Sequence, residues 1–413
     1  MRQIGFNGKR YTLEWFSDRN NATAQRQLQN AAKKVVPTCH CVADQALPLY
    51  ISHKGNTYYL AKKKNTGSSH AGWCDFSPDE TATGTGGILP ALIERNGRSN
   101  VNIDSPLTRA GSPTTRTGAA SSPGKPSVSR ATWTLRGLLE EMWDRAQLNK
   151  WFPQSKYPRR LSSVNHYLME EARHIDLGRR KLHEILVLPC FEKKAGQNWK
   201  TIEEKAKDKD IAIIVIGKLE RVVPSMFPAG GQGLRLAELD HTIWMPKELS
   251  DWASNQKEVQ ELEQKNRQIM VICTVFRDGN VLNAGSVGFR RVSLNFIPVD
   301  SGYELKVADK LVEAERFFKK PLRHRCEETL PDFVLLDMDP VVVMEVFGME
   351  NDHEYNERKK EKLEAYRRQG TIVWTWSPAS QTETVPDIPA RNDAKEEEFG
   401  TEKPWTKGEH PAP

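Results

Sequence analysis

The sequence predicts an α/β protein of several domains, with a C-terminal domain in the element order αβββαβ and a small β-rich module at the N-terminus. From residue 301, an amphipathic helix precedes three strand-like runs at residues 321–330, 331–337 and 340–348, a long charged helix and the apolar run TIVWTW. Near the N-terminus, two strand-like runs flank the turn sequence Lys-Gly-Asn, which is typical of a hairpin. At about 150 residues per domain, 413 residues correspond to two or three domains.

Changes in composition along the chain predict five segments. Residues 1–79 form the β-rich module, 80–131 a disordered linker, 132–300 a mixed α/β middle domain, 301–376 the αβββαβ domain and 377–413 a disordered tail. The linker is rich in Thr, Ser, Gly and Pro, so it buries too little apolar surface to offset its ordering entropy. Its scattered arginines can contact a polyanion, although a solvated linker is the simpler interpretation.

The overall composition favours a cytoplasmic protein without a membrane span. No run approaches the roughly 20 apolar residues that a transmembrane helix needs, and the first residues lack the apolar core of a signal peptide. The net charge of +6 permits nucleic acid as a partner without requiring it. Six cysteines in 413 residues are too few for a disulfide scaffold.

Three of the cysteines lie close together in the N-terminal module. Cys39 and Cys41 form a CxC pair, and His70 and Cys74 follow as HxxxC. Thiolate and imidazole ligands suit tetrahedral Zn²⁺, and the hairpin between the pairs can bring them together. In so short a module, a closed structural zinc site would replace the core that the module cannot build. The alternative is a set of unrelated cysteines and histidines.

Two acidic residues mark the ends of the apolar runs in the C-terminal domain. Asp332 begins the run PDFVLLD, and Glu345 lies near the end of PVVVMEVFG. Neighbouring strands are about 4.8 Å apart, so pairing of these runs would bring the two carboxylates together. Such a pair repels unless a cation lies between its members, and oxygen ligands favour Mg²⁺ or Mn²⁺. Metal-dependent phosphodiester cleavage uses this arrangement.

The αβββαβ order, with Pro-Asp and then Glu in an E-x-x-G setting, resembles the PD-(D/E)xK nuclease-like superfamily and its restriction-endonuclease-like core. The resemblance implies that Asp332 and Glu345 are metal ligands and that Glu304, in the preceding helix, completes the metal site. In this superfamily a lysine lies two positions after the second acid. Phe347 occupies that position here, so the lysine would have to come from elsewhere.

The charged helix that follows offers such a lysine. Tyr355, Lys359, Lys362 and Tyr366 are spaced by four, three and four residues and therefore share one helical stripe. Lys359 or Lys362 can then orient the attacking water and offset charge on the phosphate, whereas the alternative is an exposed basic face. For contacts with nucleic acid, the candidates are Arg323, His324, Tyr355 and Arg358.

Most of the chain also resembles a family of bacterial proteins of unknown function carried on integrative and conjugative elements or conjugative plasmids. The similarity lies in the segment from Cys39 to Cys74, in WTLRGLLEEMWDRAQLNKW and in FKKPLRH to PDFVLLD. It implies a mobile genetic element as the setting, nucleic acid, in particular DNA, as a partner, and transfer or maintenance proteins as further partners. We therefore expect a metal-dependent nuclease. The alternatives are a catalytically inactive binding module and a purely structural accessory protein.

Overall fold

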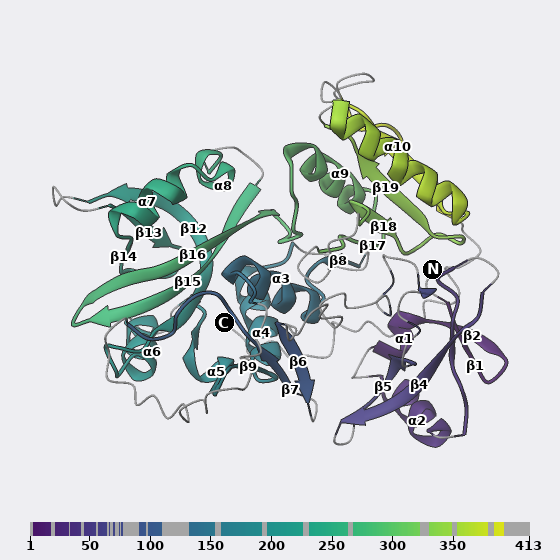
Figure 1. Ribbon diagram of the computed structural model, residues 1–413, viewed down its shortest axis with the longest axis horizontal. Coiled ribbons are helices and arrows are strands. Elements are labelled where there is room, and N and C mark those ends of the chain that lie inside the picture. Colours follow the sequence, from purple (N-terminus) through teal and green to yellow (C-terminus); the bar gives the residue numbers. More distant parts are fainter. Residues whose placement is uncertain are drawn as a thin grey trace, which may run out of the picture. The chain divides into compact units, whose positions relative to one another are not determined.

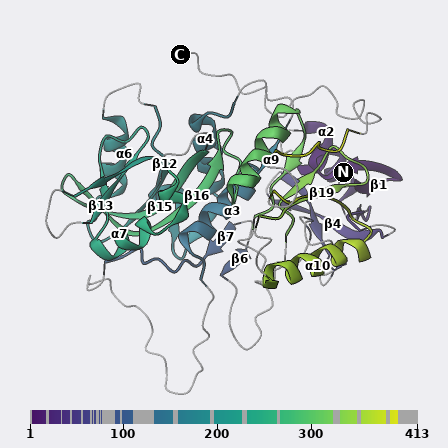
Figure 2. The same ribbon diagram turned by 90° about the horizontal axis from the view of Figure 1, so that it is seen from above.

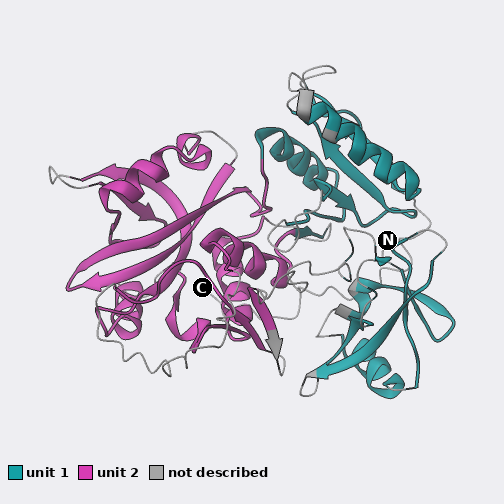
Figure 3. Cartoon of the chain, in the orientation of Figure 1, with its two compact units in different colours: residues 1–80, 150–156, 301–413 teal, residues 81–149, 157–300 magenta. Residues whose placement is uncertain are grey.

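Figure 1 shows the computed structural model, a mixed α/β protein with several sheets. The structure describes residues 3–17, 21–32, 34–42, 45–54, 57–63, 66, 69–70, 74, 76, 91–95, 98–109, 132–152, 158–191, 196–225, 231–262, 267–322, 330–348, 353–378 and 384–391. The chain divides into two compact units (Figure 3). One comprises residues 1–80, 150–156 and 301–413, and the other comprises 81–149 and 157–300. The first unit therefore unites both ends of the sequence.

The N-terminal part of the first unit is an antiparallel sheet of five strands. Their order is β2 (Lys9–Thr12), β1 (Gln3–Phe6), β3 (Thr38–Cys39), β4 (Leu47–Lys54) and β5 (Thr57–Lys62). Two helices, α1 (Leu13–Ser17) and α2 (Ala22–Ala31), follow β2. The side chain of Asn21 caps α2 by accepting a hydrogen bond from the Ala24 amide at 3.0 Å. Strands β4 and β5 form the hairpin that the sequence predicted.

The C-terminal part of this unit has the element order αβββαβ. Its helices are α9 (Gly302–Glu313) and α10 (His353–Arg368). The strands of its sheet are ordered β20 (Ile372–Trp376), β19 (Val342–Val346), β18 (Phe333–Leu335), β17 (Phe318–Lys319) and β8 (Lys150–Trp151). The strands pair antiparallel, except that β19 and β20 are parallel. Both views place β19 between α9 and α10 (Figures 1 and 2).

The first strand of this domain differs from the expectation. We expected it at residues 321–330, but the strand that pairs with β18 is β17, at Phe318–Lys319. Phe318 is fully buried and lies edge-on to Phe333 across the strand pair, with ring centroids 5.7 Å apart. This aromatic contact favours the earlier pairing. Residues 323–329 are outside the described part of the chain.

The two parts of the first unit share one hydrophobic core. Five residues of the C-terminal part, Phe317, Val334, Leu336, Val343 and Tyr366, pack in one cluster with buried residues of the N-terminal module. The latter are Ile4, Phe6, Leu13, Phe16, Ala24, Leu28, Ala31, Cys39, Cys41, Leu49, Cys74 and Phe76. A hydrogen bond of 2.9 Å from Gln3 Nε2 to Asp339 Oδ2 also joins the two parts. The N-terminal module is therefore one packing layer of the C-terminal domain, and neither buries its apolar face alone.

The second unit is built on a larger sheet. Its strands are ordered β11 (Leu186–Val187), β12 (Ile213–Pro224), β13 (Gln232–Leu236), β14 (Ile243–Trp244), β16 (Val281–Ser293) and β15 (Arg267–Asp278). Because β12 also pairs with β15, the sheet closes on itself. Continuous apolar runs in β12 and β15 supply much of the core. Three helices belong to this part: α6 (Gln197–Lys205), α7 (Lys247–Ser254) and α8 (Lys257–Gln260).

A smaller sheet in the same unit has the order β10 (Arg180–Lys181), β9 (Ile175–Leu177), β7 (Arg98–Val101) and β6 (Leu92–Arg95). Helices α3 (Leu135–Arg145), α4 (Leu161–Ala172) and α5 (Leu182–Ile185) complete the unit. Strands β6 and β7 lie within residues 80–131, where we expected a disordered linker. They are ordered because β7 pairs in parallel with β9 and because Arg98 Nε donates to Asp176 Oδ2 at 2.8 Å. Residues 102–109 of that segment are described as well, whereas 80–90, 96–97 and 110–131 lie outside the described residues.

Part of the segment expected to be a disordered tail is also described. Residues 384–391 offer backbone carbonyls to buried and half-buried side chains of the first unit. Lys310 Nζ donates to the carbonyls of Val385 and Pro386 at 2.9 and 2.8 Å, and Trp374 Nε1 donates to that of Asp387 at 3.0 Å. In the described part of the chain, no helix has both the length and the apolar character needed to cross a bilayer.

Candidate functional site

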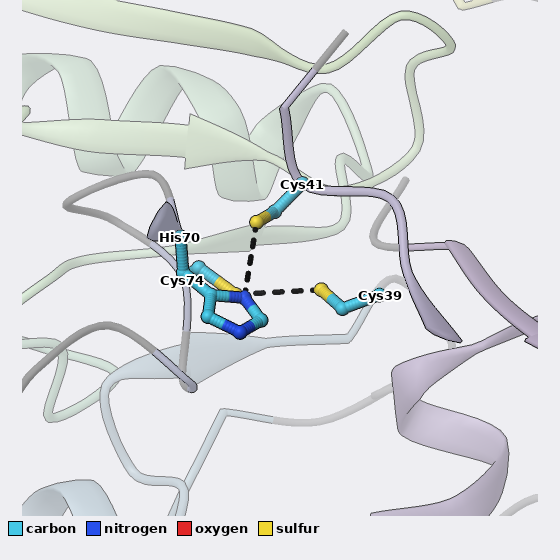
Figure 4. Close-up of side chains that lie close together, drawn as sticks. All are labelled: Cys39, Cys41, His70 and Cys74. Carbon is cyan, nitrogen blue, oxygen red and sulfur yellow. Dashed lines mark hydrogen bonds between the residues drawn. The ribbon is translucent and has the colours of Figure 1, made fainter. Parts of the chain in front are cut away.

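Four potential metal ligands of the N-terminal module converge in the structure. The ligand atoms of Cys39, Cys41, His70 and Cys74 all lie within 4.8 Å of one another, and all four residues are buried (Figure 4). The Cys39 and Cys74 sulfurs are 3.7 Å apart. His70 Nδ1 lies 3.4 Å from the Cys41 sulfur and 3.7 Å from the Cys74 sulfur. The four residues singled out in the sequence are therefore one cluster.

Strand pairing positions the first ligand of this cluster. Cys39 lies on β3, between β1 and β4, where it pairs with Ile4 on one side and Leu47 on the other. Gly5 pairs with Thr38, and a Cβ at Gly5 would meet the Thr38 hydroxyl and lie 3.0 Å from His40 Nε2. The absence of a side chain there lets β3 approach β1 closely. Cys39 is thus held by backbone on both sides.

The spacing of the four ligand atoms fits a tetrahedral zinc ion. Zn–S bonds of about 2.3 Å at tetrahedral angles place two sulfurs about 3.8 Å apart, and a sulfur and a nitrogen about 3.6 Å apart. Three of the six separations, at 3.4 to 3.7 Å, match these values, and all six are within 4.8 Å. Three thiols and an imidazole form a donor set typical of structural zinc sites. The cluster can therefore hold a metal ion such as zinc through Cys39, Cys41, His70 and Cys74.

Burial and the neighbouring thiols favour the protonated form of the cysteines in this cluster. Hydrogen bonds with Cys41 and Cys74 raise the pKa of Cys39 far above its ordinary value, and burial raises it further. Burial also raises the pKa of Cys74. Three thiolates cannot coexist here without a positive charge among them. A bound divalent cation would supply that charge and favour the deprotonated thiols.

The second site lies where β18 and β19 pair in the C-terminal domain. Phe333 is paired with Met344, and the Asp332 amide donates to the Met344 carbonyl at 3.1 Å, so Asp332 lies opposite Glu345. Asp332 Oδ2 accepts a hydrogen bond from the Val346 amide at 2.8 Å. Both acids are buried, with exposed fractions of 6% and 1%. The pairing predicted from the sequence therefore brings these two residues together.

Helix α10 provides two polar partners for Glu345. Lys362 Nζ lies 2.8 Å from Glu345 Oε2 and also donates to the Leu330 carbonyl at 2.8 Å. Tyr366, one helical turn later, donates its hydroxyl to Glu345 Oε1 at 2.8 Å. Burial and the Glu345 carboxylate raise the pKa of Tyr366 above its ordinary value, so the phenol stays protonated and remains a donor. Of the two candidate lysines, Lys362 is therefore the one in contact with the acids.

A second lysine, which was not among the residues predicted for this site, lies on the other side of Asp332. Lys320 follows β17, is only 2% exposed, and places Nζ 2.7 Å from Glu304 Oε2 and 3.7 Å from Asp332 Oδ1. Glu304 is in the first turn of α9, where the Ser301 side chain accepts a hydrogen bond from its amide at 3.0 Å. A lysine beside a buried strand carries no distinctive spacing, so only the fold brings Lys320 to the acids.

Burial and charge act in opposite directions on the two central acids. Burial raises the pKa of Asp332 most, Lys320 lowers it, and the neighbouring Glu345 raises it again. For Glu345, burial again dominates and raises the pKa, while Lys362 and Tyr366 oppose the shift. The net direction for both groups is upward. Two carboxylates that favour protonation in this way gain from a nearby cation.

The other candidate residues contact Phe347 and Ser377 or lie outside the described part of the chain. Lys359 donates to Ser377 Oγ at 3.1 Å, and its ammonium lies 4.3 Å from the centre of the Phe347 ring. Tyr355 packs edge-on against Phe347, with ring centroids 6.4 Å apart. Lys359 and Tyr355 thus both contact Phe347, the residue at the position where the resemblance led us to expect a lysine. Three candidates for contacts with nucleic acid lie outside the described structure: the residues Arg323 and His324, and the side chain of Arg358.

Within the described residues, the cysteine–histidine cluster is the set of at least three potential ligands whose ligand atoms lie close enough together to share one metal ion. The carboxylates Glu304, Asp332 and Glu345 are not arranged in this way, because the ammonium groups of Lys320 and Lys362 lie against them. A shared ion would require these side chains to adjust. The carboxylate site is thus a charge-paired cluster of acids, lysines and a tyrosine.

Comparison with known proteins identifies the chain by family alone. Residues 12–379 match the family model described as a protein of unknown function, DUF1173. No curated protein and no solved structure matches the chain. The matched region includes both the cysteine–histidine cluster and the buried acids. The chain therefore belongs to the DUF1173 family of proteins of unknown function.

Proposed function

We propose that this protein is a metal-dependent nuclease that hydrolyses phosphodiester bonds of DNA, with its active site at Asp332 and Glu345. The observation that carries the proposal is the convergence of two buried acids from paired strands with a lysine of the following helix, Lys362. The αβββαβ order of residues 302–376 supports a restriction-endonuclease-like core of the PD-(D/E)xK type. Burying several ionisable groups carries a large desolvation cost and shifts their pKa values. Groups with shifted pKa values are common at functional sites.

The chemistry assigns a separate role to each group. Asp332 Oδ1 and the Glu345 carboxylate would hold Mg²⁺ or Mn²⁺, which when bound lowers the pKa of water and offsets the charge of the phosphate. Asp332 Oδ2 stays with the Val346 amide, which keeps the carboxylate in one orientation. Lys362 would hold the attacking water and counter developing negative charge on the phosphate. Tyr366 holds Glu345 in place through its hydroxyl.

The N-terminal module would support this site structurally. A zinc ion in the cysteine–histidine cluster would stabilise a module that packs in the same core as Val343 and Tyr366, next to the acids. Reduced thiols are needed for this role, which favours action in the cytoplasm. A mobile genetic element, with its transfer or maintenance proteins, is the setting that we propose from the sequence resemblance.

Cleavage assays test the proposal directly. We expect zinc-loaded protein to cut plasmid or single-stranded DNA with Mg²⁺ or Mn²⁺, and to lose activity in EDTA. Asp332→Asn and Glu345→Gln keep the size of each side chain and should each lower the rate by at least about 100-fold, as expected when a metal ligand is lost. Asp337→Asn changes a buried acid just after β18 that pairs with Arg316, and it controls for the destabilisation caused by neutralising a buried carboxylate. Cleavage that persists in both active-site variants would remove the assignment.

A second function is favoured by one specific observation. Phe347 occupies the position of the motif lysine, and both central acids already contact ammonium groups. A nuclease-like fold in this state can serve as a nucleic-acid-binding or conjugation accessory protein without turnover. This function predicts DNA binding that weakens steeply with salt and is unaffected by EDTA. Binding at two salt concentrations, with and without chelator, separates it from the nuclease.

A further inference from the structure

Five strands of the second unit, β12 to β16, close into a barrel with a specific connectivity. In chain order, the first strand pairs with the second, the second with the third, the third with the fifth, the fifth with the fourth and the fourth with the first. These pairs are antiparallel, except that the third and fifth strands, β14 and β16, are parallel. Helices α7 and α8 lie between the third and fourth strands in the sequence, and Ala253 of α7 is buried in the barrel core. This connectivity is that of the OB-fold, a Greek-key barrel of five strands.

The first strand of the barrel serves two neighbours in succession. Residues 213–219 of β12 pair with β15, and residues 219–224 pair with β13. The register shifts between Leu219 and Arg221, where the pairing passes from one neighbour to the other. An irregularity of this kind bends a strand and increases its twist, which allows β12 to close the barrel.

One side of the barrel is covered by the rest of the second unit. The side chains of Ile214, Ile216, Met270 and Ile272 alternate along β12 and β15 with residues of the barrel core, so they point away from that core. Each of them nevertheless has an exposed fraction of 0%. Helix α3 packs against β15 and β16, and α5 packs against β12. This side is therefore closed to a ligand.

The outer face of β13 and β14 is accessible instead. Leu234 of β13 and Ile243 of β14 pair with each other and belong to the barrel core. Their neighbours Arg235 and Trp244 therefore point outward, and both are half-buried. In the OB-fold, the face of the second and third strands is the one that binds oligonucleotides or oligosaccharides. The accessible side of this barrel thus coincides with the binding side of the fold.

Two arginines lie directly opposite each other on this face. Arg221 of β12 pairs with Arg235 of β13, and Arg221 is exposed. Arg235 also donates to the backbone carbonyl of Asp240, which holds its guanidinium in place. Like charges directly opposite each other on paired strands are destabilising, and a phosphate between them would remove the repulsion. The pair therefore favours a polyanion over a neutral oligosaccharide.

Trp244 adds an aromatic ring to the same face. It pairs with Gly233, where a Cβ would lie 2.9 and 3.0 Å from Cε3 and Cζ3 of the indole. The absence of a side chain at Gly233 lets the indole lie against β13, two residues from Arg235. Ile243 and Met245, on either side of Trp244, belong to the barrel core, so the indole is placed outside it. A ring beside cations on an outer sheet face is suited to stacking with nucleic-acid bases.

We infer that the outer face of β13 and β14 binds single-stranded nucleic acid, with Trp244 stacked on a base and with Arg221 and Arg235 in contact with backbone phosphates. The bases of a duplex already stack on one another, so the ring selects a single strand. This site goes beyond the proposed nuclease function and does not depend on the buried acids of the first unit. It uses none of residues 226–230, which follow β12 and lie outside the described part of the chain.

Fluorescence anisotropy on zinc-loaded full-length protein tests the inference in a buffer without Mg²⁺ or Mn²⁺. The probes are labelled oligo-dT and oligo-rU of about 15 nucleotides, close to the largest site size of one OB-fold, and a DNA duplex of the same length. The wild type should bind oligo-dT at least about tenfold more tightly than the duplex, because the duplex offers no unstacked base. Tighter binding of oligo-rU than of oligo-dT would keep the site and assign RNA as its ligand.

Substitutions on the face separate stacking from charge. Trp244→Leu should weaken oligo-dT binding at least about fivefold, as expected when one stacked base is lost. Arg221→Gln and Arg235→Gln should each reduce the slope of log K against log salt concentration by about 0.7, the value for one phosphate contact of a single strand. Arg221→Gln should not lower the melting temperature, because it removes a repulsion from the free protein. A purely structural role of Arg221 would predict the opposite.

Two matched controls lie outside the face. Trp252→Leu removes a tryptophan of α7 that is 45% exposed and stacks on Phe289. Arg173→Gln removes an exposed arginine that pairs with Glu170. Both variants should bind oligo-dT as the wild type does.

The outcomes separate this inference from the proposed function. Tighter binding to the duplex, or binding that is unchanged in Trp244→Leu and in both arginine variants, would overturn the site. Should Trp244→Leu fail to fold, the salt slopes of the arginine variants decide the question without it. Single-strand binding that these variants lose, in a protein that cuts no DNA, would support the site and overturn the nuclease. Cleavage that depends on Asp332, together with unchanged binding in the variants of this face, would do the reverse.

Discussion

Lys362 forms an ion pair with the buried Glu345, Nζ to Oε2 at 2.8 Å, although 17 residues separate them in the sequence. The pair exists because α10 connects the parallel strands β19 and β20 and therefore packs back against the sheet. Tyr366 contacts the other oxygen of Glu345 from one turn further along the same helix. The two carboxylate oxygens are thus held by a single helical stripe.

Replacing Lys362 should affect both stability and cleavage. Lys362→Met leaves Glu345 buried without its ammonium, so we expect a loss of roughly 3–5 kcal/mol in the free energy of unfolding. Cleavage of DNA should fall by at least about 100-fold, because the lysine beside the acids is gone. Chemical denaturation and a plasmid-nicking assay measure the two effects.

Lys359→Met is the control for Lys362, because Lys359 lies on the same helix but contacts Ser377 and the Phe347 ring instead. We expect nearly full activity from this variant. A larger loss of cleavage in Lys359→Met than in Lys362→Met would assign the catalytic lysine to Lys359 and contradict the geometry.

Zinc content should depend on the four clustered residues and on no other cysteine. Purified protein should contain about one zinc ion per chain, and Cys74→Ser should lose it, because a closed tetrahedral site needs all four ligands. Cys190→Ser is the matched control, since Cys190 is exposed and contacts Asn198. Metal analysis by mass spectrometry gives the result.

Removal of zinc should also lower the thermal stability of the first unit, because metal binding favours the folded state. A melting temperature that does not change after chelation, measured with full loss of zinc, would show that the cluster is not a structural metal site.

The stability of the protein should decrease as the pH rises through about 6, in part because of Asp309. Burial and the nearby Glu313 carboxylate raise the pKa of Asp309 from 3.8 to about 6. Because the pKa of this carboxyl group is higher in the folded than in the unfolded state, its contribution to stability is fully present at a pH below the unfolded-state pKa. That contribution is lost as the pH rises through the folded-state pKa. Asp309→Asn should reduce this dependence between pH 4 and 7, and remain at least as stable as the wild type at pH 7. Urea denaturation across this range measures it, and an unchanged slope in the variant would contradict the prediction.

Substitution of the buried Asp337 should strongly lower the free energy of unfolding. Its two carboxylate oxygens accept hydrogen bonds from Arg316 Nε and Nη2 at 2.7 and 2.8 Å, and both residues are buried. Asp337→Ala would leave the guanidinium buried without its partner, at a cost of roughly 3–5 kcal/mol. Glu364→Ala removes a fully solvated pair with Arg367 and should leave the unfolding transition unchanged. Equal effects of the two substitutions would argue against the buried pair.

Local patterns in the sequence were sufficient for α9, α10, β18, β19 and β20, although not for β17, and for the cysteine–histidine cluster. Amphipathic spacing predicted α9 and α10, apolar runs predicted β18 and β19, and the CxC and HxxxC pairs predicted the ligands. These features depend on neighbouring residues, so they can be read without the fold. The register of β18 and β19 followed because acids mark corresponding ends of the two runs.

Contacts between distant segments were decided only by the tertiary structure. Strand β8 joins a sheet whose other strands begin at Phe318, β7 pairs with β9 across more than 70 residues, and Lys320 reaches Glu304 and Asp332 from outside any motif. The same holds for the N-terminal module, which completes the core beside Tyr366. Such contacts depend on how distant segments pack together in the folded chain. Two-residue strands and a single lysine have no periodic sequence pattern from which this packing could be predicted.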